Sequence, residues 1–259
     1  MNVFITGASS GIGAALAVEF ARRGATLGLV ARRHDALQTF AATLPVAATP
    51  HRIYPLDVTD RQALIAAARD FDGACGGADL VVANAGISIG VLTEFVEDLE
   101  AMREVFATNV LALAGTFHPF IAPMRRRRHG TLVGMASVAG IRGLPGSEAY
   151  CASKAAAISY CESLRVDLRG SGVRVQTLCP GFVRTPLVAS NPYAMPFILE
   201  PAEFARRAVP VMLSGRSYAV VPWQMALVAK GLRLLPNWAF DRLLGGRKRK
   251  PRRVPAAGS

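Results

Sequence analysis

The sequence is poor in the residues that form metal sites and disulfide frameworks. It holds four cysteines and four histidines among 259 residues. The cysteines show no C-x-x-C spacing and the histidines are scattered, so we expect neither a metal site nor disulfides. Unpaired thiols are typical of a reducing compartment, which favours a cytoplasmic protein.

Signals for export and for a second domain are missing as well. The opening residues, MNVFITG, enter an apolar run with no basic stretch before it and no cleavage site after it, so no signal peptide is expected. We find no internal repeat and no linker that would divide the chain. With 51% hydrophobic residues the chain can bury one large core, and a single domain is expected.

Acidic residues are scarce, at 18 against 30 lysines and arginines, which gives a formal net charge of +12. Ten of the cations lie in two clusters, 125–128 and 247–253, and without those ten the formal total falls to +2. A nucleic-acid-binding domain spreads its basic residues among aromatic ones. Such interleaving is missing, so we expect no nucleic-acid partner.

Short apolar runs alternate with helical patterns along most of the chain. Runs that are apolar on both faces are typical of strands in a parallel sheet covered by helices on both sides. The predicted strands are 2–6, 25–31, 51–56, 79–84, 130–136, 173–179 and 217–221. The predicted helices are 12–23, 34–44, 60–72, 99–126, 149–170 and 201–214. The pattern predicts an α/β fold with a doubly wound parallel sheet of about seven strands.

A glycine-rich turn follows the first predicted strand and opens the first predicted helix. It reads TGASSGIG, residues 6–13, with the spacing G-x-x-x-G-x-G. Glycines allow a tight turn and let the backbone approach a pyrophosphate at the helix N-terminus. The position of the turn between a strand and a helix predicts a dinucleotide site.

The end of the second predicted strand indicates which dinucleotide is bound. A carboxylate there would hold the ribose 2′-OH of NAD, whereas arginine accommodates the 2′-phosphate of NADP. This chain has Ala31 followed by Arg32 and Arg33. NADP(H) is therefore favoured over NAD(H), the alternative being two solvated arginines in a loop.

The segment YCASK, residues 150–154, places a tyrosine one helical turn before a lysine. Residues four apart share one face of a helix. The positive charge of an ammonium there would stabilise the phenolate form of Tyr150. It would thereby lower the pKa of the tyrosine, which is ordinarily about 10. A half-buried tyrosine above a solvated lysine has the same spacing, so the pair alone leaves both roles open.

Taken together, the motifs resemble those of the classical short-chain dehydrogenase/reductase family. They are TGASSGIG, NAG at 84–86, Asn109, Ser137, YCASK and PGFVRT at 180–185, in the order and spacing of that family. The resemblance covers residues 1 to about 221 and implies a Rossmann-type domain over 1–221. It also implies an oxidoreductase that interconverts a carbonyl compound and its alcohol by hydride transfer.

Four catalytic residues follow from the resemblance. Tyr150 would exchange a proton with the substrate oxygen. Lys154 would lower the pKa of Tyr150 and bind the nicotinamide ribose. Ser137 would polarise the carbonyl through a hydrogen bond, and Asn109 would hold a water that links Lys154 to solvent.

The cofactor contacts that the resemblance implies lie mostly on the turns after the strands. Among them, Asn84 is expected to act mainly as scaffold, because a buried asparagine that joins neighbouring strands fits equally well. The full set is Gly7, Ser9, Ser10, Gly11, Ile12, Gly13, Arg32, Arg33, Asp57, Val58, Asn84, Ala85, Gly86, Tyr150, Lys154, Pro180, Gly181, Val183 and Thr185.

In this family the loop after the P-G turn varies with the substrate. Here it would be 186–201, PLVASNPYAMPFILEP, which is markedly apolar. An apolar loop over the site favours a small hydrophobic carbonyl compound or alcohol. A loop that only packs on the core would have the same composition.

Beyond residue 221 the sequence departs from the family pattern. We expect 222–246 to form an apolar helical extension of the domain and 247–259 a basic, disordered tail. Prolines and a lysine interrupt the apolar runs before they reach the about 18 to 20 residues of a spanning helix. The extension could cover the substrate cleft, join subunits, or lie on an anionic membrane with the tail as a second anchor.

These features predict an NADP(H)-dependent oxidoreductase with a small apolar substrate, in the cytoplasm or at a membrane surface. The resemblance further implies a homodimer or homotetramer. The alternative is a catalytically silent NADPH-binding regulatory protein on the same fold. The complete set of Ser137, Tyr150 and Lys154 favours the enzyme.

Overall fold

The computed structural model describes residues 1–47, 49–246 and 248–253. In these residues the centre of the molecule is a seven-stranded sheet in the order β3-β2-β1-β4-β5-β6-β7, and every neighbouring pair is parallel. The strands are β1 (Asn2–Thr6), β2 (Thr26–Ala31), β3 (Arg52–Pro55), β4 (Leu80–Ala83), β5 (Gly130–Met135), β6 (Val173–Pro180) and β7 (Tyr218–Val221). The predicted α/β architecture is confirmed, and every predicted strand is present to within one residue at each end.

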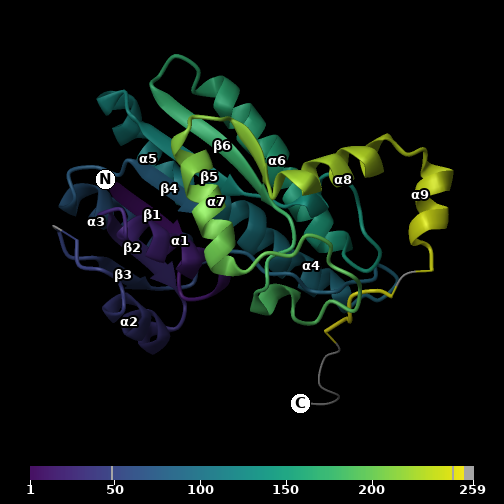
Figure 1. Cartoon of the computed structure of the whole chain (residues 1–259). Coiled ribbons are helices and arrows are strands. Elements are labelled where there is room, and N and C mark those ends of the chain that lie inside the picture. Colours follow the sequence, from purple (N-terminus) through teal and green to yellow (C-terminus); the bar gives the residue numbers. More distant parts are fainter. Residues whose placement is uncertain (48, 247, 254–259) are drawn as a thin grey trace.

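Helices connect the strands and cover both faces of the sheet (Figure 1). They are α1 (Gly11–Ala21), α2 (His34–Ala42), α3 (Arg61–Ala74), α4 (Asp98–Phe106), the π-helical η1 (Ala107–Leu111), α5 (Ala112–Arg127), the 3₁₀ turn η2 (Val138–Gly140), α6 (Glu148–Asp167), the 3₁₀ turn η3 (Pro186–Val188), α7 (Pro201–Leu213), α8 (Trp223–Leu234) and α9 (Asn237–Leu244). Helix α5 has three arginines in its last turn and is followed by Arg128, a left-handed capping residue with φ 52°. Cations at this end complement the negative end of the helix dipole.

The two faces of the sheet have separate apolar cores. One core joins strand side chains to α1, α2 and α7, with Phe20 and Phe204 fully buried. The other joins them to α3, α5 and α6, with Phe71 and Phe117 fully buried. Strands β2, β4 and β5 are buried at every position, which explains why their sequences are apolar without alternation.

The run of helix from Asp98 to Arg127 is, among the described residues, long and apolar enough by length and composition to cross a membrane. Within the fold its α5 part packs on α3 and β4. Leu113, Phe117 and Phe120 are buried in that contact. The apolar composition therefore reflects a core helix.

The strand order reverses between β1 and β4, because the chain first adds β2 and β3 on one side of β1 and then β4 to β7 on the other. At such a reversal the connections leave the sheet in opposite directions and open a crevice at the carboxyl ends of the strands. The β1–α1 turn and the segment after β4 meet at this crevice. The fold thus places the glycine-rich turn and the NAG motif side by side.

Residues 222–246 form the predicted helical extension, α8 and α9, which projects from one side of the body (Figure 1). Arg142 ties the extension to the domain. Its guanidinium donates to the carbonyl oxygens of Leu232 at 2.6 Å and Leu235 at 2.7 Å, and lies 3.9 Å from the centre of the Phe240 ring. These bonds satisfy carbonyls at the end of α8 that lack helical partners.

The basic tail differs from the sequence expectation over 248–253. These residues lie against the body instead of being disordered, because the acidic residues Asp98 and Glu104 of α4 pair with Arg252 and Arg253. Sequence composition alone shows the cations but not their partners. Residues 247 and 254–259 lie outside the described part of the chain.

Candidate active site

A cavity of about 770 Å³ occupies the crevice at the carboxyl ends of the central strands. It brings together nearly all the residues predicted for the site, from segments more than 170 residues apart in sequence. The predicted residues that line it are Gly7, Ser9, Ser10, Gly11, Ile12, Arg32, Asp57, Val58, Asn84, Ala85, Gly86, Ser137, Tyr150, Lys154, Pro180, Gly181, Val183 and Thr185. Three predicted residues, Gly13, Arg33 and Asn109, do not line it.

The glycine-rich turn forms one end of the cavity. Gly7 and Gly11 have φ values of 69° and 55°, in the left-handed region that favours glycine. A Cβ on Gly13 would collide with the carbonyl oxygen of Gly7, so this glycine allows the close packing of α1 on the turn and does not itself line the cavity. The Ser10 side chain makes no cap for α1, and the first N–H groups of a helix have no partners within it.

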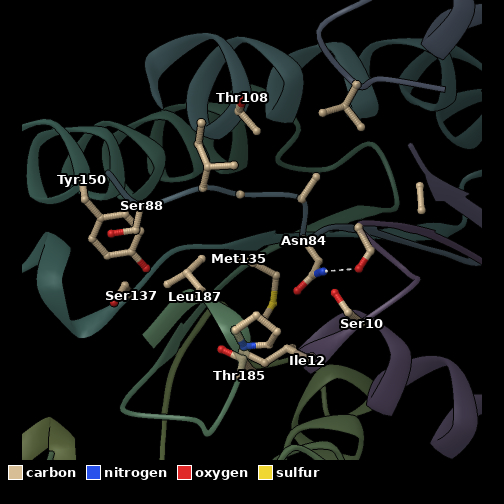
Figure 2. Close-up of a pocket in the computed structure, with 18 of the residues that line it drawn as sticks. Ser10, Ile12, Asn84, Ser88, Thr108, Met135, Ser137, Tyr150, Thr185 and Leu187 are labelled. Carbon is tan, nitrogen blue, oxygen red and sulfur yellow. Dashed lines mark hydrogen bonds between the residues drawn. The ribbon is translucent and has the colours of Figure 1, made fainter. Parts of the chain in front are cut away.

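Asn84 and Thr6 join the ends of β4 and β1. The Asn84 Nδ2 donates to the carbonyl oxygen of Thr6 at 2.9 Å, and the Thr6 Oγ1 accepts from the backbone N–H groups of Asn84 and Ala85 at 3.1 Å each. A second, longer bond from Asn84 Nδ2 to Gly7 holds the glycine-rich turn (Figure 2). The scaffold role expected for Asn84 accounts for all of these contacts.

The two arginines predicted to contact the cofactor follow β2, and only one of them lines the cavity. Arg32 is exposed and lines the cavity, beside the buried Ala31. Arg33 is also exposed but stands at the N-terminus of α2, away from the cavity wall. Asp57 lines the same region, where its Oδ1 accepts bonds from the N–H and hydroxyl of Thr59 at 2.8 and 2.7 Å.

Tyr150, Ser137 and Lys154 converge at the other end of the cavity. The hydroxyl of Tyr150 points toward Ser137 and Leu187 (Figure 2). The Lys154 ammonium lies 5.8 Å from the centre of the Tyr150 ring and donates to the carbonyl oxygen of Met135 at 2.8 Å. Ser137 follows β5, and its Oγ accepts from the Ala139 N–H at 3.1 Å, so the serine hydroxyl keeps its own proton for another acceptor.

Burial decides the protonation of this group of side chains. It raises the pKa of Tyr150 to about 12, with the hydrogen bond from Ser137 opposing the rise. It lowers the pKa of Lys154 from 10.5 to about 8. At neutral pH the tyrosine is therefore a neutral phenol that carries its proton, and the lysine is still mostly charged. Desolvation of the phenolate is the largest cause of the raised Tyr150 pKa. The lowering of this pKa by Lys154 stays a prediction.

Asn109 lies one layer behind the cavity, in the π-helical segment η1. Its Oδ1 accepts from the Ile87 N–H at 2.9 Å, and its Nδ2 donates to the Ile87 carbonyl oxygen at 3.0 Å and to Ser153 Oγ at 2.9 Å. The side chain thus anchors the loop after β4 to α6. The water relay predicted for Asn109 remains a prediction.

Some lining residues were not predicted. Ser88 and Thr108 face the cavity, as do Arg103 and Glu104 from α4 (Figure 2 shows the first two). Ser88 stands two residues after the NAG motif, and the position of that motif at the crevice was the signal that could have indicated it. No sequence motif indicates Arg103 and Glu104, because α4 reaches the cavity only through tertiary packing.

A second cavity of about 220 Å³ is lined mostly by apolar side chains, and Arg142 and Lys248 also line it. Val138 and Phe182, next to the site residues Ser137 and Gly181, form part of its wall. The helical extension supplies another part, from α8 and α9. The extension therefore forms one wall of this second cavity. The residues that line this second cavity include Tyr193, Met225, Val228, Leu232 and Leu244.

The amino-acid sequence of this chain is similar to a known protein family and to several of its members. The family model described as short chain dehydrogenase matches residues 1–195. An uncharacterized oxidoreductase of Myxococcus xanthus is 40% identical over 240 residues, which cover 93% of this chain and 94% of that protein. A 1-deoxy-11-beta-hydroxypentalenate dehydrogenase of Streptomyces exfoliatus is 40% identical over 188 residues, 71% of this chain and 68% of that one.

Solved structures agree with the sequence comparisons. An alcohol dehydrogenase from the archaeon Thermococcus sibiricus, complexed with 5-hydroxy-NADP, superposes with a TM-score of 0.72 and 28% identity. The match covers 85% of this chain and 95% of that one.

Proposed function

The chain belongs to the short-chain dehydrogenase family, and on this basis we propose that it is an NADP(H)-dependent carbonyl reductase or alcohol dehydrogenase with an apolar substrate. One observation carries the proposal. Tyr150, Ser137 and Lys154 meet at one end of a cavity whose other end is a helix N-terminus with a glycine-rich turn. A proton donor and a hydrogen-bond donor thus stand beside a site suited to a pyrophosphate.

The residues present fit a nicotinamide dinucleotide. The uncapped N–H groups of α1 suit the pyrophosphate, and the absence of a side chain at Gly7 and Gly11 lets it approach the backbone. Asp57 and Val58 would hold the adenine, and Thr185 the carboxamide. When bound, the nicotinamide supplies or accepts the hydride.

Arg32 supports NADP(H) over NAD(H). It reaches the cavity wall at the end of β2, where a carboxylate would be needed for the ribose 2′-OH of NAD. Ala31 offers no such group, and a guanidinium suits a phosphate through charge and paired donors. The relative from Thermococcus sibiricus, complexed with an NADP derivative, agrees with this choice.

In the direction of carbonyl reduction, the Tyr150 hydroxyl gives its proton to the substrate oxygen while the carbonyl carbon gains hydride. Ser137 donates a hydrogen bond to the same oxygen and stabilises its growing negative charge. The Lys154 ammonium stabilises the phenolate that Tyr150 becomes. A pKa of about 12 suits Tyr150 as the acid, because the phenol stays protonated at neutral pH until the oxygen of the substrate becomes basic.

The second cavity supports an apolar substrate. Most of its lining side chains are apolar, and one of them, Val138, directly follows Ser137 in the sequence. A substrate whose carbonyl lies between Ser137 and Tyr150 would extend its remaining atoms toward Val138 and Phe182. Hydrophobic contact would then supply most of the binding energy.

Exposed apolar side chains on two parts of the molecule support the predicted partners. Leu111 on η1 and Val166 on α6 are exposed and suit a homodimer or homotetramer joined through these helices. On the extension, Leu234 and Trp238 are 84% and 73% exposed beside cations such as Arg233, which suits contact with an anionic membrane surface. Light scattering would test the oligomer, and co-sedimentation with phosphatidylserine vesicles would test the membrane contact.

The free thiols favour a cytoplasmic setting.

The deciding experiment measures oxidation of NADPH, and separately of NADH, with a panel of apolar ketones, aldehydes and quinones. Turnover with NADPH that is lost in Tyr150→Phe is expected. Tight NADPH binding without turnover across a wide panel would favour the catalytically silent regulatory protein. Absence of NADPH binding would reject both.

A further inference from the structure

The segment 248–253, called here the C-terminal strap, returns from the extension to the α4 side of the molecule (Figure 1). Arg252 pairs with Gly90 in a parallel β-bridge, just after the NAG motif. The strap is thus joined to the loop that follows β4, and this loop lines the main cavity through Ile87 and Ser88. The strap therefore lies at the edge of the active-site cavity.

Two glycines make room for the strap. A Cβ on Gly90 would collide with the carbonyl oxygen of Pro251 and lie 2.7 Å from that of Lys250. A Cβ on Gly146, whose φ is 68°, would lie 2.8 Å from the Cβ of Arg249. Because the nearest atoms at both positions belong to the strap, the surface beneath it is shaped to receive it.

Charge pairs hold the end of the strap on α4. Arg252 donates to the carboxylate of Asp98 at 2.6 and 3.0 Å, and Asp98 is only 3% exposed. The Arg252 guanidinium also lies 3.4 Å from the centre of the Phe95 ring. Arg253 donates twice to Glu104, at 3.0 and 2.6 Å, and Glu104 itself lines the main cavity. Bidentate arginine–carboxylate pairs are among the stronger ionic contacts in proteins.

Lys250 is the residue of the strap that reaches furthest inward. It is 6% exposed, and its ammonium donates to Ser88 Oγ at 2.8 Å and to the carbonyl oxygen of Leu187 at 3.3 Å. Ser88 belongs to the loop after β4, and Leu187 to η3 in the apolar loop 186–201. Both line the main cavity. One buried ammonium thus joins two separate segments of the cavity wall.

We propose that Lys250 is a positioning residue, which holds the loop 186–201 against the loop after β4 and so sets how far the cavity entrance opens for substrate. The strap supplies the ammonium and keeps it in place through Gly90, Asp98 and Glu104. Burying a lysine costs free energy, so the position is maintained only while these contacts hold. The proposal concerns the site assigned above and, for its kinetic part, rests on the proposed function.

The test measures amide hydrogen exchange in the ligand-free, full-length protein, so it needs no substrate. Lys250→Met removes the ammonium, and Gly90→Ala displaces the strap without altering any strap residue. Each is expected to speed exchange in 183–199 and 87–92 about tenfold, since both loops lose a shared anchor. The matched controls are Lys230→Met, at an exposed lysine, and Gly143→Ala, where an added Cβ meets no atom within 4 Å.

The double variant adds a further check. Because Gly90→Ala already removes Lys250 from its place, the combined change should speed exchange no more than the larger single change. Unaltered exchange in 183–199 in both single variants would overturn the proposal. If only Gly90→Ala acted, the strap would matter without Lys250, which also contradicts the role assigned to that lysine.

A kinetic measurement separates positioning from general support of the fold. With a carbonyl substrate from the NADPH panel, Lys250→Met should raise KM about tenfold and leave kcat within about twofold, because Lys250 touches no reacting group. An equal loss in kcat would contradict the proposal. Should the wild-type protein fail to bind NADPH, the proposed function would fall, while the exchange result would still decide whether the strap anchors the loop.

Discussion

Replacing Lys154 with methionine is expected to stabilise the ligand-free protein while abolishing its activity. Lys154 is 4% exposed, and burial lowers its pKa from 10.5 to about 8. The folded state thus holds an ammonium that would be better solvated in the unfolded chain. Methionine has similar length and no charge, so it removes this cost together with the hydrogen bond to the Met135 carbonyl oxygen.

The size of the effect follows from these two terms. The pKa difference of about 2.5, at 1.36 kcal/mol for each unit, corresponds to a cost of about 3 kcal/mol at pH 7. Leaving the Met135 carbonyl without its donor costs about 1–2 kcal/mol. A net gain of about 1–2 kcal/mol remains, which for a chain of this length raises Tm by about 2–4 °C.

The difference in stability between the wild type and Lys154→Met should depend on pH. Below the folded pKa of about 8 the lysine is charged in both states, so the whole cost is present. Between pH 8 and 10.5 the unfolded chain binds more protons than the folded one, so the wild type gains stability as the pH rises. Above pH 10.5 the cost is gone, and the variant should be the less stable protein by the lost hydrogen bond.

Thermal unfolding followed by circular dichroism at pH 7, 9 and 10.5 checks this behaviour. Lys230→Met, at an exposed lysine, is the matched control and should show no difference that changes with pH in this way. The reasoning is refuted if Lys154→Met has a lower Tm than the wild type at pH 7. It is also refuted if the difference between the two proteins is the same at pH 7 and 10.5.

Three further predictions follow from the site. Ser137→Ala should lower kcat about 10² to 10³-fold with NADPH affinity unchanged, because the lost hydrogen bond forms to the reacting oxygen; steady-state kinetics and fluorescence titration measure the two effects. Arg32→Ala should weaken NADPH binding about tenfold or more and leave NADH binding nearly unchanged, as titration with both cofactors would show, and equal losses for both would argue against a 2′-phosphate contact. Gly13→Ala should lower Tm and abolish cofactor binding, because the added Cβ would collide with the Gly7 carbonyl oxygen. The control Gly73→Ala, on α3, adds a Cβ in open space and should be neutral or stabilising in the same melting experiment.

Much of the site could be predicted from the sequence because its chemistry lies in short local motifs. Tyr150 and Lys154 share a helix turn, and the glycine-rich turn combines backbone freedom with a helix start in eight residues. Ser137 and Asp57 each follow a strand, and parallel strands place such residues at the same edge of the sheet. The distinction between Arg32 and Arg33 could not be made, because it depends on which way the chain turns into α2.

The sequence by itself determined the strands, the helices and the types of residue gathered at the crevice, since periodicity and turn chemistry are properties of neighbouring residues. Only the tertiary structure decided how each group is solvated and paired. Burial of Tyr150 raises the pKa of its phenol, and the sequence could not show this burial. The tertiary structure also brought Lys250 to Ser88, 162 residues away, since the partners of a basic segment depend on surfaces that exist only after folding.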